Sequence, residues 1–262
     1  GLTWSNGTLA GSGLAIIPAG QTLTRTGGWM SRSIDVFGTF DLSGGGIMAF
    51  DSGRVLTIKP GGTLNHSGAT QISGQNATPM VSIVNEGVYN AIGTGGSFAN
   101  NLAFTNAVSG VVNVNGGNFD IVGTPAASNA GTINVANGAI CRVTNSLSQL
   151  SGPTLTGGTW NVAGTLTFPS GTNLTTIGAG ASVTLDGVAA AINKSGGGSA
   201  LSGLATNNGS LTRANGAPWG FITAGTFTNS GTFTVSGYTL TLPPGVTFNN
   251  GPDVGAGGTI NI

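Results

Sequence analysis

Gly131-Thr-Ile-Asn134 is the clearest copy of a four-residue phrase that returns along the whole chain. The phrase is a glycine, a small residue, an apolar residue, and then asparagine, aspartate or threonine. Further copies begin at Gly38, Gly62, Gly87, Gly110, Gly158, Gly209, Gly231 and Gly258. From Gly38 to Gly131 the phrase returns every 21 to 25 residues. A repeat of that length built from short strands is typical of a solenoid.

A second phrase supports the same interpretation: an apolar residue, two turn residues, a glycine, two more residues and an apolar residue. Examples are Ile17-Pro-Ala-Gly20-Gln-Thr-Leu23 and Ile58-Lys-Pro-Gly61-Gly-Thr-Leu64. Proline presets a turn, and glycine accepts the positive φ of a corner. Strand side chains alternate between two faces, so Ile133 points inward while Thr132 and Asn134 point outward. Each coil is therefore predicted to read strand, corner, strand, corner.

These patterns predict an all-β fold class, namely a single right-handed parallel β-helix with roughly ten coils of about 21–27 residues. The domain spans residues 1–262, since no shift in composition marks a boundary. Two ranges, 69–86 and 188–206, fit the repeat poorly and are predicted to project as loops. Helical signals are nearly absent; only Gly187–Ile192 could form a turn of helix, and a strand is equally compatible there.

Composition excludes several classes of function. The 262 residues include 49 glycines, and only 5% are charged, with seven basic and seven acidic side chains. A nucleic-acid binder needs a basic patch, and an anionic membrane surface needs one as well. Arg25 and Arg32, the closest basic group, are interpreted as solvated loop residues. No apolar run reaches the ~18 residues of a spanning helix. Cys141 is the only cysteine and occupies a repeat position that is apolar elsewhere, so we predict that it is buried.

The sequence predicts no enzyme. Paired carboxylates would have to come from one local group of charges, and His66 is the only histidine. We interpret His66 as an exposed residue beside an outward strand position. Ligands for zinc are lacking, so no metal site or cofactor is predicted. The local group of charges consists of Asp35, Asp41, Asp51, Arg54 and Lys59.

The outward positions of the first phrase should stack into a polar ladder along the solenoid. Its members are Asp41, Asn65, Asn90, Asn113, Asn134, Asn161 and Asn261. Stacked asparagine amides hydrogen-bond along the axis and stabilise the coils. The alternative is a flat Thr/Asn surface that binds ice, a glycan or a neighbouring rod. Val88, Tyr89 and Val111 interrupt such a surface.

The two ends of the chain carry no evident cap, although solenoids normally have polar caps over their terminal coils. One interpretation is a segment trimmed from a longer protein. The other is a subunit whose ends pair head to tail with its own copies, because a heterologous contact that does not close makes a fibre. The residues expected at such a joint are Leu2, Trp4, Ile260 and Ile262.

Phrases such as Ile17-Pro-Ala-Gly-Gln-Thr-Leu23 and Asn229-Ser-Gly-Thr-Phe-Thr-Val235 resemble the parallel β-helix repeats of large bacterial surface proteins. These proteins include autotransporter passengers and filamentous-haemagglutinin-like adhesins. The resemblance covers nearly the whole chain. It implies an exported product that acts in adhesion, surface display or fibre formation, and it carries over no catalytic residue.

We therefore expect an extracellular or cell-surface structural protein whose subunits stack end to end into a filament. Its partner would be itself, with surface glycans as a further possibility, and neither nucleic acid nor a membrane span is expected. One alternative is a stalk or spacer segment of a large secreted adhesin. The other is an ice- or glycan-binding solenoid.

Overall fold

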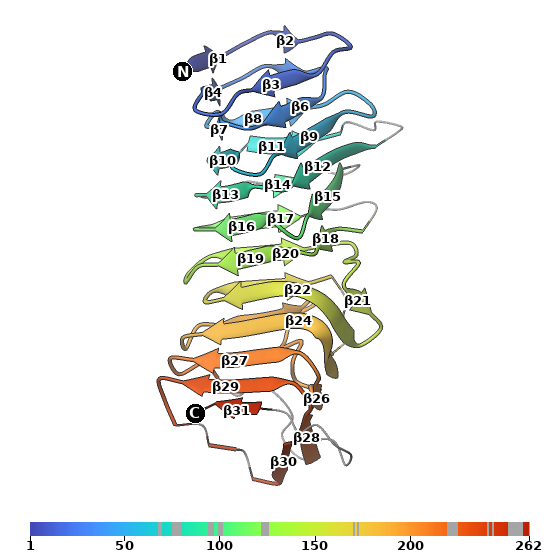
Figure 1. Ribbon diagram of the computed structural model, residues 1–262, viewed down its shortest axis with the longest axis vertical. Helices are drawn as coiled ribbons and strands as arrows, with labels where there is room; N and C mark the ends of the chain where they lie inside the picture. The colour runs from blue at the N-terminus through green and yellow to red at the C-terminus, as the bar shows by residue number, and fades with distance from the viewer. Residues whose placement is uncertain are drawn as a thin grey trace.

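The chain folds into a rod of stacked strands (Figure 1). The computed structural model describes residues 1–67, 70–74, 80–93, 97–98, 102–121, 126–169, 171, 173–218, 225–239, 241–242, 244–250 and 259–261. It is an all-β parallel solenoid of about ten turns, as the repeat predicts, and the described residues contain no helix. The hand of the solenoid stays a prediction.

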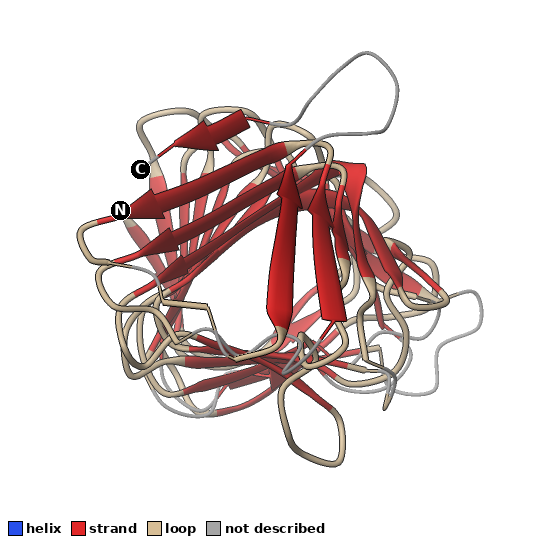
Figure 2. Ribbon diagram, turned by 90° about the horizontal axis from the view of Figure 1, so that it is seen from below, coloured by secondary structure: helices blue, strands red, loops and turns tan. Residues whose placement is uncertain are grey.

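Three sheets form the sides of the rod, and Figure 2 shows them along its axis. The longest, sheet A, has sixteen strands. Twelve of these stack on one another along the rod, and we call them the A line. They are β1 (Leu2–Trp4), β4 (Thr22–Arg25), β7 (Thr39–Leu42), β10 (Thr63–Ser67), β13 (Val88–Ile92), β16 (Val111–Val114), β19 (Thr132–Val135), β22 (Thr154–Val162), β24 (Thr176–Asp186), β27 (Ser210–Ala214), β29 (Thr232–Ser236) and β31 (Thr259–Asn261).

Two shorter sheets complete the coils. Sheet B contains β8 (Gly46–Ala49), β11 (Thr70–Ser73), β14 (Ser97–Phe98), β17 (Asn118–Ile121), β20 (Ile140–Val143), β23 (Thr165–Phe168) and β25 (Ala191–Lys194). Sheet C contains β3 (Ala15–Ile17), β6 (Ile34–Val36), β9 (Val55–Ile58), β12 (Val81–Asn85), β15 (Leu102–Asn106) and β18 (Ser128–Asn129). A separate pair joins β2 (Thr8–Leu9) to β5 (Trp29–Met30).

The position of sheet C is taken in the later coils by other strands. After β18, the first residues of β22 and then of β24 occupy this position. They are followed by β26 (Thr206–Asn207), β28 (Gly225–Asn229) and β30 (Val246–Asn250). These strands lie below β18 on the same side of the rod in Figure 1. We call sheet C and its continuation the C line. The short strand β21 (Leu150–Ser151) makes an antiparallel hairpin with β22.

Strand alternation produces one continuous apolar core. The central residue of each phrase stacks on its counterpart in the next coil: Ile133 pairs with Trp160 and Trp160 with Val183. Trp160 is completely buried, and so is Cys141, which stacks between Phe119 and Leu166. Both placements agree with the inward positions that the sequence predicts. Because each coil contributes only a few apolar residues, the core exists only when the coils stack.

Two kinds of glycine shape the corners. Gly138, from the second phrase, has φ of 77° and supplies the left-handed corner. Gly131, from the first phrase, is required for a different reason. A Cβ built on Gly131 would lie 2.2 Å from the carbonyl oxygens of Ala107 and Gly110. The first phrase therefore begins with glycine because the corner packs backbone against backbone.

The repeat extends further than the sequence indicates. Residues 69–86 include β11 and β12, which pair in register with strands of the neighbouring coils. Residues 188–206 include β25, which pairs with β23 over four residues. Residues 188 and 189 form a turn that precedes this strand, in place of a helical turn. Polar residues such as Ser82 and Thr70 break the pattern of apolar residues by which the other strands are recognised in the sequence. The backbone hydrogen-bond ladder nevertheless continues through them.

Candidate functional site

The outward ladder runs as a chain of side-chain amides along sheet A. The Nδ2 atom of Asn65 donates to Oδ1 of Asp41 at 2.7 Å, and Asn90 donates to Asn65 at 2.9 Å. The same bond continues through Asn113, Asn134 and Asn161 at 2.8–2.9 Å. Each of these side chains is half-buried. Asn261 lies four strands beyond Asn161 in the same column, after Thr184, Thr212 and Thr234.

Asp41 sets the direction of this ladder. A carboxylate only accepts hydrogen bonds, so Asn65 must use its NH₂ group toward Asp41 and its oxygen toward Asn90. The constraint passes from amide to amide, and every donor points toward the N-terminal end. A charged acceptor strengthens the first bond, and neighbouring bonds polarise one another. Aspartate therefore suits the first position better than the asparagine found elsewhere in the ladder.

A second column of small side chains runs beside the ladder, and we call the two columns together the Thr/Asn face. The second column contains Thr132, Thr159 and Ser182 in successive coils, with Val88 and Val111 interrupting it. Tyr89 was expected to interrupt the outward surface as well, and this is wrong. Its side chain points inward, is fully buried, and packs against Phe119. The two valines keep the branched shape of threonine but lack its hydroxyl group.

A second asparagine ladder lies inside the solenoid, where the C line turns into the A line. Asn85 donates to Asn106 and Asn106 to Asn129, both at 2.7 Å. Nearer the C-terminus, Asn207 donates to Asn229 and Asn229 to Asn250, again at 2.7 Å. Of these six, all but Asn250 are at most 1% exposed. Sequence reasoning missed this inner ladder, although an asparagine two residues before a phrase glycine, as in Asn129-Ala-Gly131, would have signalled it.

The inner ladder stops where the chain no longer turns a corner. Leu155 and Ile177 precede the A-line residues of their coils and stack on each other in place of an asparagine pair. In these two coils β22 and β24 run on without a break, with a register shift between Leu155 and Gly157. The buried amide thus marks the sharp corner, because its NH₂ group bonds corner carbonyls that would otherwise be buried without partners.

Three polar side chains share one inward column at the ends of A-line strands. Arg25 and His66 were predicted to be solvated, and both are only 1% exposed. Arg25 donates to the carbonyl oxygens of Gly28 and Ile47, while His66 contacts the Thr70 carbonyl oxygen at 2.7 Å. Arg213, also buried, donates to Ala217. Burial lowers the pKa of both arginines and lowers that of His66 to about 4. These side chains cap backbone carbonyls at the corner, which explains their place in the core.

The charged residues that lie close together in the sequence, between Asp35 and Lys59, do not gather at one site in the fold. Lys59 lies 3.7 Å from both Asp35 and Glu86 and links three coils, while Asp41 belongs to the ladder and Asp51 is exposed. Within the described part of the chain, no three of the His, Cys, Asp and Glu side chains gather into a potential metal site. Among the described residues, no helix is long and apolar enough to cross a membrane.

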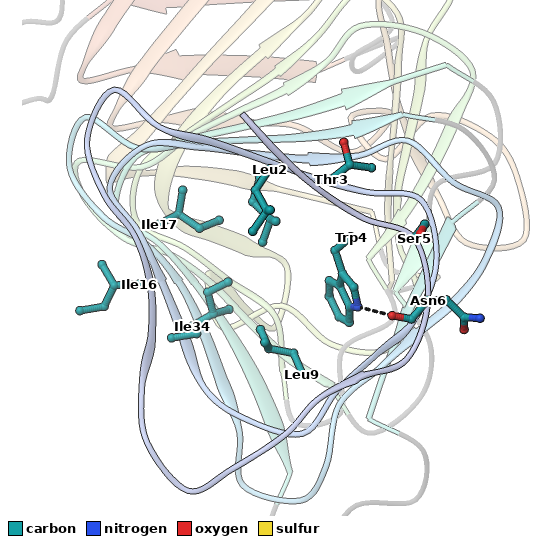
Figure 3. Close-up of a pocket in the computed structure, with 11 residues that line it drawn as sticks. Leu2, Thr3, Trp4, Ser5, Asn6, Leu9, Ile16, Ile17 and Ile34 are labelled. Atoms are coloured by element: carbon teal, nitrogen blue, oxygen red, sulfur yellow. Dashed lines mark hydrogen bonds between the residues drawn. The ribbon is translucent and has the colours of Figure 1, made fainter.

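The N-terminal end of the rod is apolar and open. Leu2 belongs to the inward column, where it stacks on Leu23, yet the residue is 69% exposed because no described residue covers it. An open cavity of about 560 Å³ lies beside it, lined mainly by apolar residues that include Trp4, Leu9 and Ile34 (Figure 3). The indole of Trp4 donates to the carbonyl oxygen of Asn6 at 3.0 Å and lies over the guanidinium of Arg25.

The last described strand, β31, continues the register of the A line. Ile260 of β31 occupies the register position of Phe233, the column to which Leu2 belongs at the other end of the rod. Ile262 lies outside the described residues. Of the four residues predicted at a joint, Leu2 and Ile260 therefore share one column, and Trp4 lines the cavity beside it.

Comparisons of this chain with protein-family models, with curated proteins and with solved structures find no match.

Proposed function

We propose that this chain is an extracellular structural protein whose solenoids stack end to end into a filament. The observation that carries the proposal is Leu2, a core-column residue that is 69% exposed beside an open apolar cavity. Exposed apolar patches of this kind mark interaction sites. Among the described residues, six of the ten exposed large apolar residues lie within the first 47 positions, which concentrates this surface at one end of the rod.

The first and last strands, β1, β3, β30 and β31, also contain none of the residues that normally prevent edge pairing. Edge strands are protected by lysine, proline or inward charges. Residues 1–24 and 214–252 contain no charged side chain. One coil of 21 to 25 residues on each side of a joint matches the roughly 20–30 residues per side of a standard interface.

Electron microscopy and sedimentation over a range of concentrations test this function. We expect fibres with an axial repeat of about 50–60 Å, because eleven or twelve strand layers lie about 4.8 Å apart. Leu2→Lys places a charge on the exposed column and should raise the concentration needed for fibres at least about tenfold, the equivalent of ~1.4 kcal/mol. Val108→Lys, at a corner residue that is 84% exposed, is the matched control. Single rods at every concentration would instead favour a stalk or spacer segment.

A second candidate function is recognition of ice or a glycan by the Thr/Asn face. The specific observation is that Tyr89 points inward, so the face carries small side chains over successive coils and Asp41 as its one charge among the described phrase positions. Thermal hysteresis and a glycan array would measure it. Thr132→Lys should abolish binding, whereas Thr105→Lys, exposed on sheet C, should not. Equal activity of the two variants would rule out this face.

A further inference from the structure

A recess lies beside the outer ladder, where the A-line strands end and the chain turns toward sheet B. Over successive coils, the column of outward residues at this corner reads Asn115, Ala136, Ala163, Asp186 and Ala214. Two alanines therefore stand between an asparagine and an aspartate. Because an alanine side chain ends at Cβ, the surface is hollowed over these two coils and the larger neighbours form the ends of the recess.

Two adjoining hollows of about 340 and 380 Å³ lie along this recess and share Ala163 and Asp186. We call the two together the Ala163 groove. It extends from Asn115 to Asn215 over β16, β19, β22, β24 and β27, which follow one another along the rod (Figure 1). Strand layers about 4.8 Å apart give it a length of about 19 Å. A groove of this shape fits an extended chain better than a flat ice surface.

The ladder amides beside the groove keep part of their hydrogen-bonding capacity. A side-chain amide has two N–H donors and an oxygen with two lone pairs. Asn134 uses one donor toward Asn113 and one lone pair toward Asn161, each at 2.8 Å. One donor and one lone pair of Asn134 therefore remain for a ligand. In the coil that follows Asn161, Thr184 adds a hydroxyl, which can both donate and accept.

Asp186 is the one charged side chain among the described residues that line the groove, and Asn215 holds it in place. The Nδ2 atom of Asn215 donates to Oδ1 of Asp186 at 2.7 Å. Asn215 is the only described residue other than glycine with a positive φ, at 51°. Gly216 follows with φ of 79°, so both central residues of this corner are left-handed, as in a type I′ turn. This uncommon conformation sets the Asn215 amide against one carboxylate oxygen and leaves the other oxygen for a ligand.

The strands beneath the groove restrict the class of ligand. β19, β22 and β24 each pair with a strand on both sides, so they offer no free edge to an added peptide strand. A ligand must be bound through side-chain amides, a hydroxyl and a carboxylate, and the carboxylate repels acidic ligands. Val188, at the rim, is 80% exposed and adds an apolar contact. Hydroxyl groups that alternate with apolar C–H faces are the features of a sugar chain.

We propose that the Ala163 groove binds an oligosaccharide without acidic groups, which lies along the rod axis. The ladder amides and Thr184 bond its hydroxyl groups, and Val188 packs against the C–H face of a ring. Asp186 accepts a charge-assisted bond from a hydroxyl or an amino group. The proposal rests on glycan recognition, the second candidate function above, and assigns it to one groove. It does not depend on end-to-end assembly, because the groove lies between β16 and β27.

An array of oligosaccharides tests the groove, with oligomers of glucose, xylose, mannose, N-acetylglucosamine, glucosamine and galacturonic acid as probes. We expect wild-type protein to bind one or more of the neutral or amino-bearing chains and not the galacturonic acid chain. Ala163→Leu fills the floor of the groove from an outward position and should weaken this binding at least tenfold. Ala103→Leu, at a half-buried outward alanine of β15, is the matched control and should leave it unchanged. Asp186→Asn should weaken binding of the glucosamine chain more than that of a neutral chain.

The outcomes separate this site from the function on which it rests. Loss of binding in Ala163→Leu and not in Ala103→Leu supports the groove. Binding that survives Ala163→Leu overturns the groove, and if Thr132→Lys then abolishes it, glycan recognition by the Thr/Asn face is kept. Binding of the galacturonic acid chain alone overturns the assigned ligand class. No binding to any probe overturns both the groove and glycan recognition, and leaves the filament to its own test.

Discussion

The inner asparagine ladder should contribute more stability per residue than the outer one, and Asn106→Ala tests this against Asn113→Ala. Asn106 is fully buried. Its Nδ2 atom bonds Asn129 at 2.7 Å, Thr132 at 3.1 Å and Gly110 at 3.2 Å, while its oxygen accepts from Asn85 at 2.7 Å. Truncation removes all four bonds and leaves buried groups that water cannot reach.

The expected magnitudes follow from burial. A buried polar atom that loses its partner costs about 1–3 kcal/mol, and several atoms lose theirs at Asn106, so we expect a loss of about 3–5 kcal/mol. Asn113 bonds Asn90 at 2.9 Å and Asn134 at 2.8 Å, but it is half-exposed. Water replaces the amide there, and a net value of about 0.5–1.5 kcal/mol per bond gives a loss of about 1–2 kcal/mol.

Urea unfolding followed by circular dichroism, at concentrations where the rods are dispersed, measures both losses from the midpoint and slope. Asn106→Asp sharpens the comparison, because it turns a donor into a buried carboxylate facing carbonyl oxygens, and we expect it to be worse than alanine. Equal losses for Asn106→Ala and Asn113→Ala would refute the reasoning, since burial would then not decide the contribution of an amide ladder.

Three further predictions concern single side chains. Gly131→Ala should cost at least ~3 kcal/mol in urea unfolding, because its Cβ meets backbone oxygens at 2.2 Å, whereas Gly45→Ala, with open space around it, should change little; similar midpoints would contradict the close approach. His66 has its pKa lowered to about 4 by burial, so the unfolded chain binds the extra proton between pH 6.5 and 4, and the free energy of unfolding should fall by about 3 kcal/mol as the pH drops through this window. His66→Gln should remove most of that slope, and an unchanged slope would assign it to other groups. Burial raises the pKa of Cys141 to about 12, so a thiol reagent at pH 8 should label it only at the rate of unfolding, and rapid labelling of folded protein would place it at the surface.

Period and alternation were enough to predict the fold. The spacing of Gly110 and Gly131 gives the coil length, and Thr132-Ile-Asn134 gives the face of each residue. The outer ladder followed from the same period, since register is fixed once one face is buried. The failures at His66 and Arg25 have one physical cause: a polar residue was assigned to solvent. His66 and Arg25 are buried because backbone carbonyls at the corner need donors, and residue type alone does not reveal that need.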